Sequence, residues 1–341
     1  MLRTMTVALL VVVMGPLGMA TAAQPTRLTV GGTAFPNTAG EQQWLKFERN
    51  VREKAGADFD IRMLIYGQLG SEEQLVSGLR RGRVDYANLS AMVASTVVPE
   101  LALLYMPYLF FSNEEADFVY DHYLTARFSE LLDDGGLHFV AWNEIGFHHV
   151  YSKQPIILPA DASGVRFRIS AAPSARLFAQ AIGADVIPLG FGEIVASLQT
   201  GLISAGENSV TLYARTGTAD EAPHLTLTGH AFGMSIIVAG NRWWKRLKPA
   251  QQQLLSDAFP SIQVTRTAIR AEEATDLRRA QEIGFTVHAL TVEQRQQWMA
   301  AVTATHEQLV DEVGGRSREI YELIQRGKAD FARQQAVATT Q

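Results

Sequence analysis

The spacing of hydrophobic residues changes repeatedly along the first ninety residues. Segments 27–32, 58–67 and 84–90 alternate apolar and polar positions, as half-buried strands do. Between them, 41–56 and 71–83 carry apolar residues three and four positions apart, which is typical of amphipathic helices. The order strand, helix, strand, helix, strand predicts a parallel sheet in an α/β domain.

A second unit with a similar rhythm follows a long predicted strand at 137–152. We expect strands and helices to alternate in it, at 164–170, 174–183, 184–190, 192–201, 204–209 and 230–240. Two such α/β units predict two lobes with a cleft between them. In open α/β sheets, ligands bind beyond the carboxyl ends of the strands.

The chain is helical in pattern after the second unit. A helix is expected from Pro249 to about Gly284, and Pro260 should kink or split it because proline lacks the backbone N–H of a helical residue. Further amphipathic helices are expected at 291–314 and 318–327, followed by a frayed tail.

The N-terminus has the layout of a secretory signal peptide. Arg3 precedes an apolar run at 7–14, Gly15 and Pro16 interrupt that run, and small residues at 20–22 predict cleavage near Ala22. The run is well short of the about 20 apolar residues that a membrane-spanning helix needs. We therefore expect an exported, periplasmic protein.

Composition excludes several functions. Of 341 residues, 47% are hydrophobic and the net charge is −5 without a basic run, so the chain can bury a core and nucleic acid is an unsuitable partner. There is no cysteine, which excludes disulfides, thiolate metal sites and cysteine nucleophiles. Neither Gly-x-Ser-x-Gly nor His-Glu-x-x-His occurs. We expect no catalytic residues, no metal and no cofactor.

The strand "GVRFRIS" at 164–170 carries the most informative charge. Arg166 and Arg168 alternate with apolar residues, so both lie on the polar face, and Arg168 is at the carboxyl end where a cleft is expected. A guanidinium there suits a ligand carboxylate, because its planar fork matches two carboxylate oxygens. The alternative is an ion pair with Asp161 or Asp185, which are close in sequence.

Four segments carry a resemblance to a known family. They are "YGQLGSEEQLVSGLRRGRVDYA" (66–87), "PYLF" (107–110), "PADASGVRFRI" (159–169) and "PLGFGEIVASLQTGLISAGENS" (188–209). In this order and spacing they resemble the periplasmic substrate-binding proteins of TRAP (tripartite ATP-independent periplasmic) transporters. The resemblance extends from about Leu28 to Gly327. Such proteins bind organic acids between two lobes and deliver them to a membrane permease.

The resemblance implies a fold class and a division of the chain. The fold would be the bilobed α/β periplasmic-binding-protein fold, with two α/β domains, hinge strands near 145–147 and 233–235, and a long connecting helix. The division would be a signal peptide (1–22), lobe I (23–145 plus 234–273), lobe II (146–233 plus 274–330) and a tail (331–341).

The resemblance also implies site residues. Arg168 would anchor the ligand carboxylate, and the amide of Asn208 would help to hold it, although Asn208 could instead cap a strand end. His148 stands where many members carry a second arginine, and this difference favours a monocarboxylate, or a hydroxy or keto acid, over a dicarboxylate. Alternatively, His148 is a core or surface histidine. Glu207 is expected to be structural.

Five more residues occupy positions where the family contacts its ligand: Thr33, Phe35, Ser90, Phe191 and Tyr213. Each could instead be a packed aromatic residue or a loop cap. The expected partners are a small organic acid and the permease subunits, and we expect a monomer. Two other transport-related roles remain open, a binding protein of an ATP-driven importer and a sensor-coupled receptor, and an exported enzyme is the remaining alternative.

Overall fold

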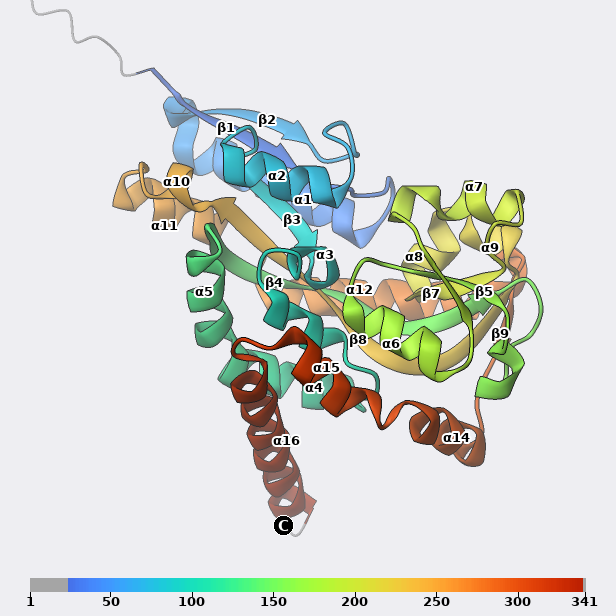
Figure 1. The fold of residues 1–341 in the computed structure, drawn as a ribbon. Helices are drawn as coiled ribbons and strands as arrows, with labels where there is room; N and C mark the ends of the chain where they lie inside the picture. The colour runs from blue at the N-terminus through green and yellow to red at the C-terminus, as the bar shows by residue number, and fades with distance from the viewer. Residues whose placement is uncertain (1–23, 340–341) are drawn as a thin grey trace, which may run out of the picture.

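The computed structural model describes residues 24–339, so the predicted signal peptide at 1–22 lies outside the described residues. One sheet organises this part of the chain, with the strand order β2-β1-β3-β8-β4-β7-β5-β6 and with β9 paired to β8 (Figure 1). The strands are β1 (Thr26–Gly31), β2 (Phe59–Leu64), β3 (Tyr86–Ser90), β4 (Leu137–Ser152), β5 (Arg166–Ile169), β6 (Asp185–Pro188), β7 (Ala205–Ser209), β8 (His224–Gly240) and β9 (Thr286–His288).

Helices surround the sheet. The α-helices are α1 (Ala39–Ala55), α2 (Glu72–Arg81), α3 (Ala91–Ala94), α4 (Asn113–Val119), α5 (Thr125–Asp134), α6 (Pro173–Ala181), α7 (Ile194–Gln199), α8 (Val210–Arg215), α9 (Thr218–Glu221), α10 (Asn241–Trp244), α11 (Pro249–Ala258), α12 (Ile262–Arg278), α13 (Ala280–Ile283), α14 (Val292–Val302), α15 (Thr305–Val313) and α16 (Ser317–Thr339). Shorter helical turns are η1 (Gly56–Asp58), η2 (Pro99–Tyr105), η3 (Tyr120–Leu124), η4 (Pro159–Ala162) and η5 (Phe191–Glu193). No helix within residues 24–339 is long and apolar enough to cross a membrane.

The sheet has two halves joined by its two longest strands. We call the half built on β1, β2 and β3 lobe I, and the half built on β5, β6 and β7 lobe II. Strands β4 and β8 have 16 and 17 residues and pair with each other along both halves (Figure 1). The expected bilobed α/β fold with connecting strands is therefore present.

The sheet is mixed rather than parallel throughout. Pairing is parallel between β1 and β2, β1 and β3, and β5 and β6, as the strand–helix alternation predicts. It is antiparallel where β8 meets β3 and β4, and where β4 meets β7. The parallel pairing predicted from residues 27–90 is confirmed, whereas the antiparallel centre was not part of that prediction, because β4 and β8 cross between the lobes instead of belonging to local strand–helix–strand units.

Helix α1 shows how local sequence builds lobe I. The Thr38 hydroxyl accepts a hydrogen bond from the Glu41 amide and caps the helix start. Trp44, Phe47 and Val51, at helical spacing, are buried against the sheet. The ring of Phe47 stacks on that of Tyr86 in β3 with 4.9 Å between centroids. The apolar spacing thus places the helix over strands that end at the lobe boundary.

The C-terminal third agrees with expectation at Pro260 and differs from it in two later segments. The helix after residue 249 is split around Pro260 into α11 and α12, as predicted. The segment expected as one helix at 291–314 is two, α14 and α15. Helix α16 continues to Thr339, through the stretch expected to be a tail. It packs on η2, η3 and α4, which belong to the range expected in lobe I (Figure 1).

A buried ion network fixes α12 to the crossing strands. Glu144 of β4 has a fully buried side chain, and Arg270 donates to both of its oxygens at 2.8 and 2.6 Å. Arg266 and Arg270 also pair with Asp117, and Arg266 with Asp121. Burial raises the pKa of Glu144 above its ordinary value, although both arginines act in the opposite direction.

The two crossing strands approach each other closely beside this network. Their register shifts between Glu144 and Gly146, and Gly146 has a φ of 98°, which favours glycine. A Cβ atom on Gly233, its partner in β8, would lie 2.7 Å from the Gly146 carbonyl oxygen. Only glycine lets the strands cross this tightly, so the bend between the lobes depends on this pair.

We predict that Gly233→Ala destabilises the protein by about 1–3 kcal/mol, because the added methyl group must displace backbone. Urea unfolding would measure the loss. Gly40→Ala is the matched control: Gly40 is in the first turn of α1, where a Cβ atom meets only the Thr38 hydroxyl oxygen at 3.7 Å. Equal stability of Gly233→Ala and the wild type would contradict the role of this crossing.

Candidate functional site

Arg168 lies at the carboxyl end of β5 and is buried, with 6% of its surface exposed. Its Nε donates to the Leu189 carbonyl oxygen at 3.0 Å, which orients the guanidinium. No acidic side chain of residues 24–339 lies within the 4.0 Å of an ion pair. Asp161 instead accepts from the amides of Ile157 and Leu158. Arg168 is thus a buried cation without an internal counter-ion.

Two further polar groups share its face of the sheet. In the β4–β7 register Tyr151 is opposite Gly206, and His149 is opposite Asn208. Since Phe167 is the partner of Ala205, Arg168 shares a face with Gly206 and therefore with Tyr151 and Asn208. A Cβ atom at Gly206 would lie 2.2 Å from the Tyr151 hydroxyl, so the phenol lies directly over that glycine.

The polar atoms of this pair are available for a ligand. Asn208 Oδ1 accepts from the Ser209 amide at 2.9 Å, whereas its Nδ2 has no hydrogen-bond partner among the described residues. The Tyr151 hydroxyl likewise lacks one there. Both side chains are buried, and a buried polar atom without a partner costs free energy. Two donors and one guanidinium therefore converge on one side of lobe II.

His148 lies on the opposite face from Asn208. Its Nδ1 is 2.5 Å from Glu207 Oε2, and the Nε2 of His230 is 3.5 Å from the same oxygen. Burial alone would raise the pKa of Glu207, but the adjacent charge and hydrogen bond of His148, with those of His230, hold this pKa well below its ordinary value. Burial lowers the pKa of His230. The structure thus joins His148 to Glu207 in the core rather than to Arg168.

Lobe I contributes a serine and a carboxylate. Ser90 ends β3, and its hydroxyl accepts from the Val93 amide and caps α3. The same hydroxyl donates to Glu72 Oε2 at 2.5 Å, and the Ser90 amide donates to that oxygen at 3.1 Å. Glu72 is the first residue of α2 and is half-buried. Thr33 forms an isolated backbone bridge with Tyr66 in the loop after β1.

The contacts between the lobes include three that involve loops and helix ends. The rings of Phe35 in lobe I and Phe191 in lobe II are 5.6 Å apart between centroids. The Ser170 hydroxyl donates to Met92 Sδ at 3.1 Å. Arg215 of α8 donates to the Asn37 carbonyl oxygen at 2.8 Å, and also pairs with Asp276 and Glu272 of α12. The lobes are therefore closed on each other in this structure, which explains the burial of Arg168.

Tyr213 lies in the core, next to Tyr151. It is fully buried, its hydroxyl donates to the Ala222 carbonyl oxygen at 2.8 Å, and its ring stacks on Tyr151 with 6.0 Å between centroids. Tyr213 is therefore a packed aromatic residue, which was the alternative that the sequence allowed. Its contact with the candidate site is its stacking on Tyr151.

Sequence reasoning missed Tyr151 and Glu72. Tyr151 can be recognised only from the register of β4 on β7, because its own strand does not show which neighbour it covers. The sequence does contain a signal that indicates the position of Glu72. In a strand–helix–strand unit the helix begins at the edge where the strands end, so an acidic first residue of α2 comes close to the end of β3.

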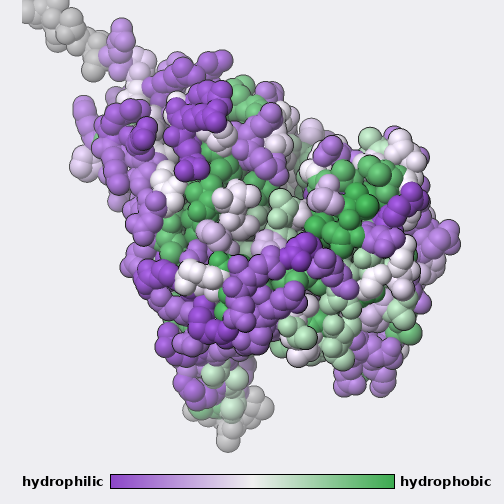
Figure 2. Space-filling view, viewed as in Figure 1, coloured by the Kyte–Doolittle hydropathy of each residue, from purple (hydrophilic) through white to green (hydrophobic). Residues whose placement is uncertain are grey.

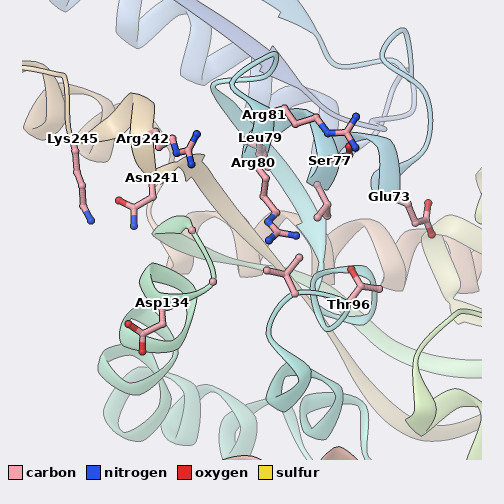
Figure 3. A pocket seen from close by; sticks show the side chains of 14 residues that line it. Glu73, Ser77, Leu79, Arg80, Arg81, Thr96, Asp134, Asn241, Arg242 and Lys245 are labelled. Carbon is pink, nitrogen blue, oxygen red and sulfur yellow. The ribbon is translucent and has the colours of Figure 1, made fainter.

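A separate depression of about 650 Å³ lies on lobe I between α2, α10 and the end of α5 (Figure 3). Arg80, Arg81, Arg242 and Lys245 line it, and none of them has an acidic partner within 4.0 Å in residues 24–339. Its lining includes no residue of lobe II, so closure of the lobes would not change it. In contrast, Figure 2 shows hydrophobic residues gathered on the facing sides of the two halves, over α7 in particular.

Comparison with known proteins identifies the family. The model of the family described as bacterial extracellular solute-binding protein, family 7 (DctP), matches residues 30–312. The chain belongs to this family. Arg168, Tyr151 and Asn208 share one face of lobe II in this family 7 protein.

Similar proteins include several that are named for what they bind. The ectoine-binding periplasmic protein TeaA of Halomonas elongata is 24% identical, over 92% of this chain and 93% of its own length. The 2,3-diketo-L-gulonate-binding periplasmic protein YiaO of Escherichia coli is 25% identical, over 71% of this chain and 74% of its own. The galactonate complex of DctPAm from Advenella mimigardefordensis has the same fold, with a TM-score of 0.84 at 21% identity, covering 89% and 99% of the two chains.

We predict that Glu207→Gln lowers the free energy of unfolding by about 3 kcal/mol at neutral pH, because it removes the charged acceptor of a buried hydrogen bond to His148. Urea unfolding would measure this. Glu307→Gln is the matched control, since Glu307 is exposed and pairs with Arg318 at the surface, and should cost less than about 1 kcal/mol.

The cost of Glu207→Gln should depend on pH in one direction. Because the folded pKa of Glu207 is lowered, its stabilisation is fully present above the ordinary value of 4.5 and is lost as the pH falls from there toward the folded value. The difference between wild type and variant should therefore shrink below pH 4.5. A difference that grows on acidification would show that Glu207 is protonated in the folded protein.

Proposed function

We propose that this family 7 protein is the periplasmic solute-binding component of a TRAP transporter. It captures a small organic acid between its lobes and delivers it to a membrane permease. The observation that carries this proposal is the buried guanidinium of Arg168, which has no acidic partner in residues 24–339 and lies where the two lobes meet.

A ligand carboxylate supplies the missing counter-charge. A desolvated cation costs several kcal/mol unless it is paired, and a guanidinium pairs best with a planar carboxylate through two parallel hydrogen bonds. Each such charge-assisted bond contributes about 1.5–3 kcal/mol, against the roughly 8 kcal/mol of micromolar binding. The amide of Asn208 and the hydroxyl of Tyr151 would supply further donors to the same carboxylate.

Binding would proceed from an open arrangement of the lobes. In the closed arrangement Arg168 is inaccessible, so the ligand must reach lobe II before Phe35, Thr33 and Ser90 of lobe I cover it. Strands β4 and β8 bend at the Gly146–Gly233 crossing. The ligand favours closure only to the extent that it binds the closed state more tightly than the open one.

The ligand we propose is a monocarboxylate or a hydroxy or keto acid. The position of the family's second arginine is held by His148, which is committed to Glu207 and does not offer a second cation beside Arg168. Phe35 and Phe191 supply apolar contact from both lobes. Relatives named for ectoine, diketogulonate and galactonate bind molecules of this size range with one carboxylate.

The partner we propose is a TRAP permease. The alternatives are an ATP-driven importer and a sensor-coupled receptor. A solved structure of a TRAP periplasmic solute-binding protein from Shewanella oneidensis, with bound succinate, shares the fold at a TM-score of 0.84 and 19% identity. Relatives with TRAP names favour the first possibility. Two neighbouring permease-subunit genes would support it, and an adjacent ATPase gene would oppose it.

We predict that Arg168→Ala weakens binding of the cognate acid by about 3 kcal/mol, roughly 100-fold, because two charge-assisted hydrogen bonds are lost. Isothermal titration against an acid selected by thermal-shift screening, with galactonate, succinate and ectoine in the panel, would measure this.

Arg166→Ala is the matched control for this prediction. Arg166 is on the same strand, is exposed, and has no residue of lobe I among its contacts described here. Its replacement should change the affinity less than about twofold. Unchanged binding by Arg168→Ala would overturn the proposed function.

A further inference from the structure

Two basic segments of the chain line the depression on lobe I. Residues 79–83, at the end of α2, read LRRGR, and residues 241–248, in and after α10, read NRWWKRLK. The first segment carries three cations and the second four, and neither contains an acidic residue, although the whole chain has a net charge of −5. None of these cations forms an ion pair within residues 24–339. One sign of charge is therefore concentrated on this face.

Exposed arginines elsewhere in the chain are mixed with acids. Arg52 pairs with Glu48 on α1, and Arg318 of α16 pairs with Glu307 of α15, each at 2.7 Å. Interspersed charges of both signs are the usual state of a solvated surface. A cation in the last turn of a helix opposes the helix dipole, which accounts for Arg80 on α2. It does not account for a second basic segment beside the first.

Close backbone packing holds the two segments side by side. A Cβ atom on Gly240, directly before α10, would lie 2.8 Å from the Leu79 carbonyl oxygen of α2. The backbone amide of Asn241 donates to the Gly136 carbonyl oxygen, and its side-chain Nδ2 donates to that of Asp133, both at 3.1 Å. The end of α5 is thus joined to α10. The walls of the depression are fixed to one another, so a ligand does not have to assemble them.

The cations surround a space rather than covering a flat face. Figure 3 shows Arg80 extending from α2, and Arg242 and Lys245 from α10 and its end, around the depression of about 650 Å³. Glu73 and Asp134 also line it, but within residues 24–339 neither carboxylate is within 4.0 Å of an arginine or lysine nitrogen. Like charges around a concave surface focus the electric field and raise the local concentration of anions.

We propose that this depression is a second binding site, which takes a phosphate group, either free or in a lipid headgroup. Guanidinium groups bind phosphate through paired hydrogen bonds, and the several oxygens of a phosphate accept from cations on different elements. A carboxylate has two oxygens in one plane, so a single arginine satisfies it. Because the lining comes from lobe I alone, the site exists whether the lobes are open or closed. It does not depend on the organic acid.

The test removes one cation from each wall of the depression. Arg80→Gln combined with Arg242→Gln removes two charges at exposed positions, so folding should be unchanged, and urea unfolding checks this. The matched control combines Arg49→Gln with Arg62→Gln. Both of these arginines are exposed in lobe I, on α1 and β2, outside the depression. The two double variants therefore have the same net charge.

Two probes distinguish the sources of the phosphate. Isothermal titration with inorganic pyrophosphate measures binding of a soluble phosphate. Cosedimentation with vesicles of phosphatidylcholine, with and without phosphatidylglycerol, measures binding of a lipid headgroup. A third probe, an oligoglutamate peptide, represents an acidic protein partner. Each measurement includes Arg168→Ala, because that variant separates binding in the depression from binding of an anion between the lobes.

The wild type and Arg168→Ala should both bind pyrophosphate or the vesicles that contain phosphatidylglycerol, and more weakly as salt is added. The Arg80→Gln, Arg242→Gln variant should bind at least roughly tenfold more weakly, because two charge-assisted contacts are lost. The control variant should change by less than about twofold. Binding of pyrophosphate alone would indicate a soluble phosphate, and binding of the vesicles alone a lipid headgroup.

Four results would overturn the inference. Neither phosphate probe binds the wild type, or both double variants lose affinity equally, which would show that only net charge matters. Oligoglutamate binds as tightly as the phosphate probes, which would indicate an acidic protein partner instead. Arg168→Ala abolishes the binding of pyrophosphate, which would place the anion between the lobes. The proposed function is tested with organic acids and stands or falls separately.

Discussion

The structure depends most on a guanidinium that is buried without an acidic partner in residues 24–339. Arg168 keeps one orienting bond, from Nε to the Leu189 carbonyl oxygen, and its other nitrogens contact no carboxylate of these residues. Such an arrangement is costly in a folded protein unless a second molecule completes it. The fold accepts this cost at the junction of the two lobes, which is where the proposed ligand would pair with the cation.

The remaining charges are arranged so that they do not neutralise Arg168. Glu207 is occupied by His148 and His230 on the other face of the sheet. Glu144 is occupied by the arginines of α12. Glu72 is held by Ser90 on the opposite lobe. Each of these carboxylates has a partner of its own, and Arg168 has no acidic partner within residues 24–339.

The sequence predicts the local elements and the position of Arg168 at a strand end, and the structure adds what depends on strand pairing. Arg168 could be selected because strand alternation and its position at a strand end are local properties. Pro260 splits a helix for an equally local reason. Tyr151 and the antiparallel centre depend on which strands are neighbours, and periodicity does not contain that information. The error about His148 has the same cause. His148 and Arg168 were expected at one site, but the strand register places His148 beside Glu207 on the other face.

The central ladder also determines the order in which the molecule can fold. Strand β8 is the only link through which β4 joins the sheet of lobe I in the described chain, since β3 pairs with β8 and β8 with β4. The N-terminal lobe therefore cannot complete its sheet until residue 240 is present. Contacts this distant in sequence slow folding, so the late arrival of β8 sets a lower limit on the time that lobe I needs to complete its sheet.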